Sequence, residues 1–487
     1  MESMKQANIN ALRVWGGGLF EFDNFYEMAD RYGILLWHDH MFACNVYPID
    51  EDFLNSVRAE VASNVMRLRH HPSILAWAGN NENEAAIVEK WAMWQVENYT
   101  QEQQIYDYKI LTINTTKPII DSLDPSRPFL SSSPSNGIET DSNGGVSKFD
   151  PNNQFYGDVH FYNEDKNLWK VYTFPIPRCA TEFGVQSVPL TNTMTRWVNS
   201  SEWTYGSKRM VMRQHHPGGL MNNLNMVFSH FEIPYECDGY NSSTLYNCSF
   251  VQTSKDFLND FAYLSQIHQA IAMQTESEHY RRYRSFIDPD GRGNTMCALY
   301  WQLNDIWAAP TWSSIDFDQN WKVLHYYVRR FFAPIIVSLY FDEKNQLNVY
   351  VVNDFMNNSN INYSLKLDIL TWKNGFTPIY SITKTINVIN MGSVKVDGIQ
   401  DDLNSKNITL NDNDEFVIQA ILYDSSNQPQ SPLAILLPNK MKQISNTDYG
   451  DATISNVTKI DNKTYKVTLS ATKIVPVLCI ARIIAVH

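Results

Sequence analysis

Residues 70–84 read HHPSILAWAGNNENE, and this stretch sets the pattern for the first two thirds of the chain. A short apolar run (73–79) is followed at once by five polar residues, which include Glu82 and Glu84. Short apolar runs bounded by polar residues are typical of buried strands. Six further runs have the same character, and they are INALRVW (9–15), ILLWH (34–38), PFLSS (128–132), YGDVHF (156–161), RCATEF (178–183) and MCALYWQ (296–302).

Helical patterns separate these strand-like runs. Residues 52–67 carry apolar side chains at four-residue spacing, and residues 255–276 carry a similar apolar stripe. Helices that alternate with strands indicate parallel βαβ units. Because polar and charged residues gather just after the strands, the pattern favours a (β/α)8 TIM barrel. A doubly wound sheet is the alternative, but no glycine-rich phosphate motif follows the first strand.

The strand count and a change in composition divide the chain into three predicted parts. Seven strands are found where a complete barrel has eight, so we expect the first strand to be missing from this chain. After residue 335 come alternating runs that are typical of immunoglobulin-like β-sandwiches. We therefore predict a barrel at 1–335, a β-sandwich at 336–430, and a linker with a partial second sandwich at 431–487. The runs are LNVYVVNDF (347–355), SLKLDILTW (364–372), FVIQAILYD (416–424) and YKVTLSA (465–471).

The composition excludes several classes of protein. The 487 residues include 39 Lys and Arg against 52 Asp and Glu, which gives a formal charge of −13. This acidic balance argues against a nucleic-acid or membrane partner, either of which would favour a basic patch. No apolar run approaches the ~18 residues of a membrane-spanning helix. Since 44% of the residues are apolar, the chain has ample material for a core.

Cysteines and sequons point to the secretory pathway. The chain has ten N-x-Ser/Thr sequons, and Cys237 and Cys248 bracket the polar loop CDGYNSSTLYNC. A disulfide that closes this loop is expected. Cys44, Cys179 and Cys297 lie in apolar runs and are expected to be buried thiols. The opening residues MESMKQANIN contain no signal peptide, so we expect a secretory protein whose N-terminus is missing from this chain.

Two of the strand-like runs end in a glutamate set among small and polar residues. Glu82 follows the 73–79 run, and Glu182 lies in RCATEFGVQS. Two carboxylates at one end of a barrel are what glycoside cleavage requires, because one protonates the leaving oxygen and the other attacks or activates water. The pattern alone is weak, since the chain has 52 acidic residues and most such residues are solvated surface charges.

Longer motifs carry a resemblance to a known family. HHPSILAWAGNNENE resembles the acid/base segment of family 2 of the glycoside hydrolases, and RCATEFGVQS resembles its nucleophile segment. Four more motifs are similar to the β-mannosidase branch of that family. They are RVWGGG (13–18), DVHFYN (158–163), RQHHPGG (213–219) and MCALYWQLNDIWAAPTW (296–312). The resemblance covers nearly all of residues 1–335 and extends more loosely beyond.

This resemblance implies a lysosomal, retaining exo-β-mannosidase that acts on β-mannoside oligosaccharides. Glu82 would be the acid/base, Glu182 the nucleophile, and Asn81 would bind the sugar 2-hydroxyl. The two carboxyl groups should then lie roughly 5–5.5 Å apart. The pKa of Glu82 should be raised, in part by the charge of Glu182. Glu84 is the rival acid, but the Asn-Glu context favours Glu82.

The remaining candidates are aromatic and hydrogen-bonding residues that follow predicted strands. A pyranose offers an apolar face and a rim of hydroxyls, which suits such a lining. The alternative for each tryptophan is packing in the core or in a loop. The family lines its pocket at several of these strand ends. The candidates for substrate binding are Arg13, Trp15, Asp39, His160, Tyr162, Trp301, Asn304, Asp305 and Trp307.

No cofactor and no metal is expected. His38 and His40 flank Asp39 on one strand, but no third ligand stands at a recognisable spacing, and relatives carry Gln and Phe at these two positions. His215 and His216 lie in a turn-rich loop where a structural role is expected.

Two other functions stay open. One is another family 2 exo-glycosidase, a β-galactosidase or a β-glucuronidase. The other is an inactive carbohydrate-binding fragment, since full-length relatives have two β domains before the barrel that are missing here. Retention of both glutamates favours the enzyme, and RVWGGG and YWQLNDIW favour the mannosidase.

Overall fold

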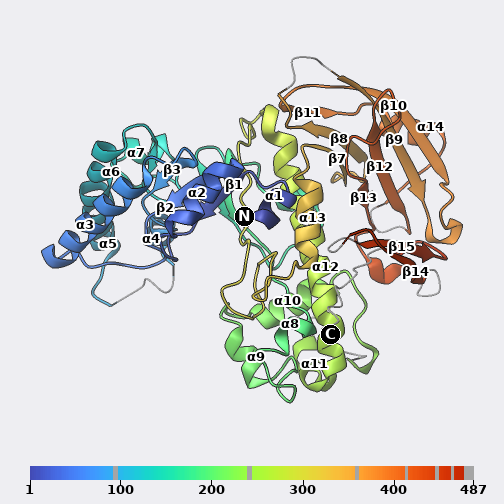
Figure 1. The fold of residues 1–487 in the computed structure, drawn as a ribbon, viewed down its shortest axis with the longest axis horizontal. Coiled ribbons are helices and arrows are strands. Elements are labelled where there is room, and N and C mark those ends of the chain that lie inside the picture. The colour runs from blue at the N-terminus through green and yellow to red at the C-terminus, as the bar shows by residue number, and fades with distance from the viewer. Residues whose placement is uncertain are drawn as a thin grey trace. The chain divides into compact units, whose positions relative to one another are not determined.

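The chain forms two compact units. The computed structural model describes residues 1–91, 97–237, 244–356, 361–411, 415–444, 449–461 and 465–475. The first unit comprises Met1–Tyr162, Phe174–Gly184 and His279–Trp301. The second comprises Asn163–Thr173, Val185–Glu278 and Gln302–His487. Figure 1 labels many of the helices and strands of both units.

The strands of the first unit are short and run parallel to their neighbours. They pair in the order β1-β2-β3-β4, and β5 pairs separately with β6. Residues 296–301 lie alongside β6 as a further extended segment. The amide of Leu299 donates to the carbonyl of Ala180 at 2.8 Å, and the amide of Trp301 donates to the carbonyl of Phe183 at 2.8 Å. The strands are β1 (Ala11–Val14), β2 (Leu35–Asp39), β3 (Ile74–Ala78), β4 (Phe129–Leu130), β5 (Asp158–Phe161) and β6 (Cys179–Phe183).

All seven predicted strand-like runs thus occur as extended, parallel segments of the first unit. Helices connect several of them, which confirms an α/β architecture. The pairings among the described residues do not amount to a closed ring, so the (β/α)8 barrel stays a prediction. The helices are α1 (Glu2–Gln6), α2 (Asp23–Tyr32), α3 (Glu51–Leu68), α4 (Asn83–Val88), α5 (Gln101–Tyr108), η2 (Lys109–Thr116), α6 (Lys117–Leu123), α7 (Ile138–Ser142) and η6 (Tyr283–Ser285).

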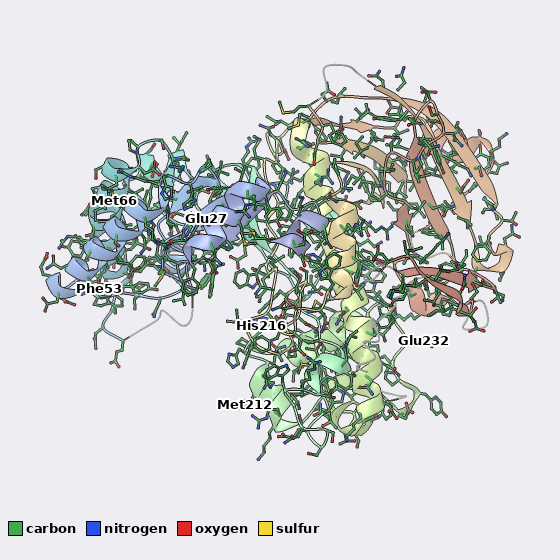
Figure 2. All side chains as sticks on the ribbon, viewed as in Figure 1. Glu27, Phe53, Met66, Met212, His216 and Glu232 are labelled. Atoms are coloured by element: carbon green, nitrogen blue, oxygen red, sulfur yellow. A yellow bond between two sulfur atoms is a disulfide. The ribbon has the colours of Figure 1, made fainter. Side chains whose placement is uncertain are left out.

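Helix α3 illustrates how the apolar pattern becomes structure. It begins after Asp50, whose side chain accepts a hydrogen bond from the amide of Phe53 at 3.0 Å and so caps the first turn. Its buried face consists of Leu54, Val57, Val61, Val65 and Leu68, at three- and four-residue spacing. The helix predicted at 52–67 is therefore confirmed. Figure 2 labels Phe53 and Met66, which also lie on this helix.

The register of the strands brings their carboxyl ends to one edge. Val14 pairs with His38, and Asp39 pairs with Ala78. Backbone pairing continues past the strand ends, where Asn81 bridges to both Ala43 and Ser133. Side chains that follow β2, β3 and β4 are therefore held in one row along this edge.

The helical part of the second unit surrounds an apolar cluster of its own, which includes Tyr205, Leu224 and Phe261. Helix α12 confirms the helix predicted at 255–276 and extends it. A disulfide joins Cys237 to Cys248, as expected. The helices of the unit are η3 (Val171–Thr173), α8 (Thr191–Met194), α9 (Lys208–Arg213), α10 (Gly219–Phe228), η4 (Tyr235–Cys237), η5 (Leu245–Asn247), α11 (Ser249–Thr253), α12 (Lys255–Arg282), α13 (Val323–Phe331), η7 (Trp372–Asn374), α14 (Ile399–Ser405) and η8 (Met441–Gln443).

Two antiparallel sheets form a β-sandwich in the rest of the second unit. Their orders are β10-β9-β12-β13 and β11-β8-β7, and residues from both sheets, such as Val349 and Leu367, share one buried core. A separate hairpin pairs β14 with β15. The strands are β7 (Ile335–Phe341), β8 (Leu347–Asn353), β9 (Ile361–Leu370), β10 (Tyr380–Val388), β11 (Gly392–Lys395), β12 (Val417–Tyr423), β13 (Ala434–Leu436), β14 (Ala452–Lys459) and β15 (Tyr465–Ala471).

The four strand-like runs predicted after residue 335 are all confirmed. Because β13 pairs with β12, the first sandwich continues past residue 430, where the sequence pattern placed its end. The three-part division as a whole stays a prediction. In the part of the chain that the structure describes, no helix is long and apolar enough to cross a membrane.

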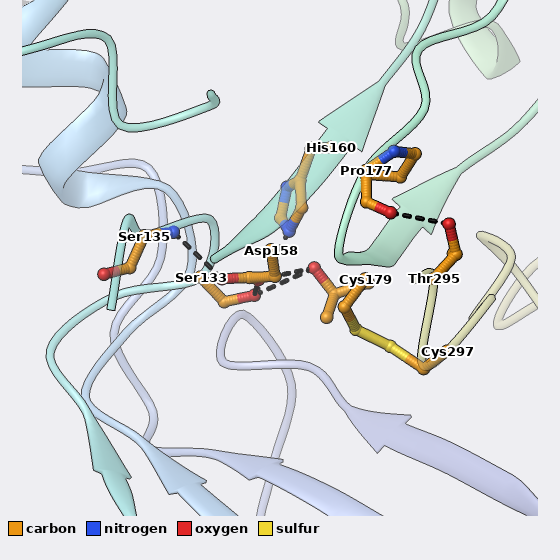
Figure 3. The surroundings of a disulfide bond; sticks show 9 residues. Ser133, Ser135, Asp158, His160, Pro177, Cys179, Thr295 and Cys297 are labelled. Atoms are coloured by element: carbon orange, nitrogen blue, oxygen red, sulfur yellow. Dashed lines mark hydrogen bonds between the residues drawn. A yellow bond between two sulfur atoms is a disulfide. The ribbon is translucent and has the colours of Figure 1, made fainter. Parts of the chain in front are cut away.

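The expectation of free thiols at Cys179 and Cys297 is wrong. The structure joins them in a disulfide across 118 residues of sequence, between β6 and the segment that pairs with it (Figure 3). Their partnership follows from the adjacency of two strands and not from any local spacing. Cys44 is a free thiol, as expected, and it is partly buried.

Candidate active site

The candidate site lies at the carboxyl ends of the strands of the first unit. Arg13 is in β1, Asp39 ends β2, and Glu82 comes four residues after β3. His160 is in β5 and pairs directly with Glu182 in β6. The strand register therefore brings together side chains that are up to 169 residues apart in sequence.

Glu182 is held by two donors. The guanidinium Nη1 of Arg13 donates to its Oε2 at 2.5 Å, and the hydroxyl of Tyr162 donates to its Oε1 at 2.8 Å. Burial and the charge of Glu182 raise the pKa of Tyr162 well above its ordinary value, so this hydroxyl stays a donor. Glu182 is thus fixed in position by a cation and a phenol at the base of the site.

The guanidinium of Arg13 donates hydrogen bonds to three neighbouring side chains. It donates to Asp39 Oδ2 at 2.6 Å and to Asn81 Oδ1 at 2.7 Å, besides Glu182. Burial lowers the pKa of Arg13, but the charges of Asp39 and Glu182 outweigh burial and raise it, so the guanidinium is charged. Burial also raises the pKa of Asp39 to about 6, against the opposing effect of Arg13.

Glu82 is fixed by its backbone and through both carboxylate oxygens. Its amide donates to the carbonyl of Ser133 at 2.8 Å, and its φ of 62° places it in the left-handed region. Oε1 lies 2.8 Å from Nδ1 of His160. Oε2 accepts from the thiol of Cys44 at 3.1 Å and from the side-chain amide of Asn81 at 3.3 Å. Three side chains from three different strand ends therefore surround this carboxylate.

The pKa of Glu82 is lower than its ordinary value, so the expectation of a raised pKa is wrong for the protein in this state. Burial acts to raise it, but the hydrogen bond and charge of His160 outweigh burial. The expected increase came from the charge of Glu182. That charge is already compensated by Arg13 at 2.5 Å.

The two glutamates lie close together. One carboxylate oxygen of Glu82, one of Glu182 and a ring nitrogen of His160 all lie within 4.8 Å of one another. Retaining glycosidases hold their two carboxyl groups about 5–5.5 Å apart, whereas inverting enzymes need about 6.5–9.5 Å to admit a water. The observed proximity is compatible with the retaining arrangement.

The same three side chains form a group that could ligate a cation among the residues described. The guanidinium of Arg13 already supplies positive charge to Glu182 at 2.5 Å. The His160 nitrogen that faces the carboxylates lies 2.8 Å and 3.2 Å from them, which are hydrogen-bond distances. We therefore interpret the group as a hydrogen-bonded ion cluster.

The two histidines that flank Asp39 lie apart from this group. His38 and His40 are both buried against the ring of Trp77.

Glu84, the rival acid, is engaged elsewhere. It is fully buried on α4 and accepts hydrogen bonds from the amide of Ser147 at 2.7 Å and the hydroxyl of Thr140 at 3.1 Å. Burial raises its pKa to about 8. Glu84 is therefore a protonated, structural carboxyl group at neutral pH.

Two tryptophan candidates of the first unit, Trp15 and Trp301, are in contact. The rings of Trp15 and Trp301 are 5.1 Å apart between centroids and tilted by 59°. Both are partly exposed. The pair offers an apolar surface formed from the first and last strand segments of this unit.

Three candidates belong to the second unit. Asn304 is exposed, whereas Asp305 is buried and accepts from the hydroxyl of Thr311. Trp307 packs against His215 at 4.2 Å between ring centroids. Their part in sugar binding stays a prediction. His216 pairs with Glu164 at 2.9 Å, within the same unit.

Sequence reasoning missed three residues around this cluster: Cys44 and Ser133 contact it, and Asp158 contacts Ser133. Cys44 and Ser133 follow strand-like runs and Asp158 lies within one, which is the signal that could have found them. They were passed over because a small polar residue or a thiol carries no distinctive chemistry until its neighbours are known.

The fold and the site define a class. A pair of hydrogen-bonded glutamates at the carboxyl ends of parallel strands, of which Glu182 is buried and Glu82 partly buried, is an arrangement typical of glycoside hydrolases. No family model matches the chain.

Similarity to individual proteins is extensive. The probable β-mannosidase of Caenorhabditis elegans is 44% identical over 480 residues, which are 98% of this chain and 52% of that protein. The β-mannosidase of Capra hircus is 44% identical over 354 residues, which are 73% of this chain and 38% of that protein. The chain is therefore a homologue of the animal β-mannosidases, and it spans about half the length, or less, of these relatives.

Solved structures agree with this relationship. The β-D-mannosidase from Dictyoglomus thermophilum superimposes with a TM-score of 0.75 at 26% identity, and covers 97% of this chain and 51% of its own. The exo-chitosanase of Amycolatopsis orientalis superimposes with a TM-score of 0.64 at 16% identity, over 98% of this chain and 53% of its own. The second likeness concerns the fold alone.

Proposed function

We propose that the protein is a retaining exo-β-mannosidase that removes terminal, non-reducing β-D-mannose from β-mannosides, including oligosaccharides derived from N-glycans. The observation that carries the proposal is the proximity of Glu82 and Glu182, whose carboxylate oxygens lie within 4.8 Å. Retaining enzymes hold their carboxyl groups closer together than inverting enzymes do, so this proximity favours attack by the enzyme itself. The homology to β-mannosidases supports the choice of sugar.

Glu182 is the proposed nucleophile. Its carboxylate attacks the anomeric carbon through an oxocarbenium-like transition state and forms a mannosyl-enzyme. Arg13 and Tyr162 orient its two oxygens, so that little reorganisation is needed before attack. The charge of Arg13 also stabilises this carboxylate electrostatically, at 2.5 Å.

Glu82 is the proposed acid/base. It protonates the leaving oxygen in the first step and accepts a proton from the attacking water in the second. Asn81, directly before it, is proposed to bind the sugar 2-hydroxyl. Asn81 is buried, and both ends of its amide already contact the site, which pre-orients it for this bond.

The sugar is proposed to pack on the aromatic pair Trp15 and Trp301. Aromatic rings offer an apolar face that complements the apolar face of a pyranose. Asp39 is proposed to contribute to the hydrogen-bonding rim of this sugar site. We further propose that the seven parallel segments belong to a (β/α)8 barrel, since the residues at their carboxyl ends converge as that fold requires.

A lysosomal location is proposed as well. Two disulfides, Cys179–Cys297 and Cys237–Cys248, support an oxidising secretory route, and ten sequons are compatible with it. Digestion of the cell-derived protein with an endoglycosidase should increase its gel mobility, and the protein should co-fractionate with lysosomal hydrolases. An unglycosylated, cytosolic protein would refute this location.

The direct test is hydrolysis of p-nitrophenyl β-D-mannoside at pH 4–5. Because the chain spans about half of its relatives, the assay compares this chain with a version extended upstream in its gene. Glu182→Ala is the control in each. We expect mannoside hydrolysis that is lost in the variant and absent with the β-galactoside and β-glucuronide. Folded protein without mannosidase activity in either version would refute the proposal.

A further inference from the structure

His160 lies between the two glutamates, and its Nδ1 faces both of them. This nitrogen is 2.8 Å from Glu82 Oε1 and 3.2 Å from Glu182 Oε2. An ionised carboxylate offers only acceptors. A proton on Nδ1 satisfies both of these oxygens at once, because it is shared between the two carboxylates.

The other ring nitrogen also faces an acceptor. Nε2 of His160 lies 3.2 Å from the hydroxyl oxygen of Ser133, which in turn lies 2.7 Å from Asp158 Oδ2 (Figure 3). A hydroxyl has one proton, and the shorter contact to the charged acceptor takes it. The lone pairs of Ser133 are then left for Nε2, so this nitrogen is a donor too.

Asp158 is fixed as the acceptor at the end of this chain of hydrogen bonds. The amide of Ser135 donates to its Oδ1 at 3.0 Å, and the hydroxyl of Thr181 donates to its Oδ2 at 2.6 Å. With donors on both oxygens, Asp158 acts as the acceptor of the Ser133 hydroxyl. Both nitrogens of His160 therefore donate, which is the hydrogen-bonding pattern of an imidazolium.

The charges around His160 favour the same state. The groups that face it from the neighbouring strand ends are the carboxylates of Asp39, Glu82, Asp158 and Glu182 and the guanidinium of Arg13. Tyr162 and Cys44 contact the same carboxylates as neutral donors. Burial lowers the pKa of His160, but Glu182 and the hydrogen bond to Glu82 outweigh it and raise the pKa. An imidazolium at His160 would be a second cation beside Arg13, and it would compensate the excess of carboxylates over cations in this cluster.

We propose that His160, and not Glu82, holds the catalytic proton in the resting protein, and that it delivers this proton through Glu82 to the leaving group. The proposal rests on the proposed glycosidase function. It makes His160 a positioning and proton-holding residue for the carboxylate pair, where the sequence analysis placed it among the sugar contacts. It also resolves how Glu82 can be ionised at rest and still act as an acid.

One proton leaves His160 in the first step and returns to it in the second. As the bond from Glu182 to the anomeric carbon forms and the glycosidic C–O bond breaks, Nδ1 gives its proton to Glu82, and Glu82 gives a proton to the leaving oxygen. Glu182 loses its charge in the ester, which weakens its hold on the imidazolium and favours this transfer. Water then cleaves the ester, its proton passes to Glu82 and back to Nδ1, and its hydroxide joins the sugar.

The kinetic test compares wild type with His160→Asn. The asparagine amide can still donate to Glu82 but has no proton to give away. For a mannoside with a poor leaving group, such as β-1,4-mannobiose, we expect kcat/KM to fall more than 100-fold. For the 2,4-dinitrophenyl mannoside, which needs no acid, we expect a loss below 10-fold. Equal losses with both substrates would show a merely structural role and overturn the proposal.

A second readout does not depend on activity. Nitrogen-15 NMR of protein labelled at histidine ring nitrogens reports how many ring nitrogens are protonated, and His160→Asn or His160→Gln assigns the signal. We expect both nitrogens of His160 to be protonated at pH 6–7 in the folded wild type. A neutral tautomer at that pH would overturn the proposal. If the protein is doubly protonated at His160 but hydrolyses no glycoside, the proposed function fails and not the assignment of the proton.

Discussion

Glu82 and Glu84 are two residues apart, yet their surroundings shift their pKa values in opposite directions. His160 lowers the pKa of Glu82, whereas burial raises the pKa of Glu84 to about 8. The difference arises from the turn between β3 and α4, which directs one side chain to the strand-end cluster and the other to Ser147 and Thr140. Neighbours in sequence thus have different proposed roles because of the partners that the fold gives each of them.

Amide variants of the two glutamates should separate their roles. Glu82→Gln removes the carboxylate that passes a proton to the leaving oxygen and should lower kcat/KM for a poor leaving group by about 10²–10⁴-fold. Glu84→Gln replaces a neutral acid by a neutral amide and should change kcat/KM by less than about 3-fold. Steady-state kinetics on β-1,4-mannobiose provides the measurement. A large loss in Glu84→Gln with the fold intact would exchange the two assignments.

Glu84 should also make stability depend on pH. Its pKa is about 8 in the folded protein against an ordinary value of 4.5, so the unfolded chain releases this proton first. The free energy of unfolding should therefore fall as pH rises from about 4.5 to about 8, by on the order of a few kcal/mol from this group. Urea unfolding across this range should show the fall in wild type and a shallower one in Glu84→Gln. Identical slopes would mean that Glu84 ionises normally.

The thiol of Cys44 donates a hydrogen bond to Glu82 Oε2 and should help to position this carboxylate for catalysis. Cys44→Ser keeps a donor at this position and should leave kcat/KM within about 3-fold of wild type. Cys44→Ala removes the donor, which costs about 1 kcal/mol and should lower kcat/KM about 5-fold. The two variants are to be compared at pH 5 on the same mannoside. Equal losses would mean that the size of the side chain matters and not its proton.

At the scale of the element, the strand ends build the site and the helices stabilise it. The sequence predicted all seven strand segments, α3 and α12, because apolar periodicity reports burial directly. It could not predict the row formed by Ala43, Asn81 and Ser133, because pairing past the strand ends depends on register. The contacts of Cys44 and Ser133 with the site depend on that row and were therefore missed.

Helix α3 offers a matched pair of variants. Leu68 is fully buried at its end, whereas Met66, two residues before, is 49% exposed. Leu68→Ala should lower the free energy of unfolding by about 2–5 kcal/mol, and Met66→Ala by less than about 0.5 kcal/mol. Thermal or urea unfolding at pH 7 measures both. Similar effects of the two substitutions would contradict the packing described for this helix.

At the scale of the whole molecule, a few long-range contacts define the chemistry. Glu82 and Glu182 were predicted as a pair from their motifs, but their partner His160 was assigned to the sugar. The disulfide Cys179–Cys297 was missed, because its cysteines are 118 residues apart and meet only through the pairing of two strand segments. Motifs identify reactive residues well, whereas the protonation and the hydrogen-bond partners of those residues require the assembled sheet.

The central claim is that Glu182 attacks the sugar, and covalent trapping tests it most directly. The protein is incubated with 2-deoxy-2-fluoro-β-mannosyl fluoride, whose fluorine slows hydrolysis of the intermediate, and then analysed by mass spectrometry. We predict one added fluoromannosyl group per chain, on the peptide that contains Glu182, and none in Glu182→Gln. A label on another residue, or turnover of mannosides with inversion and no label, would contradict the account.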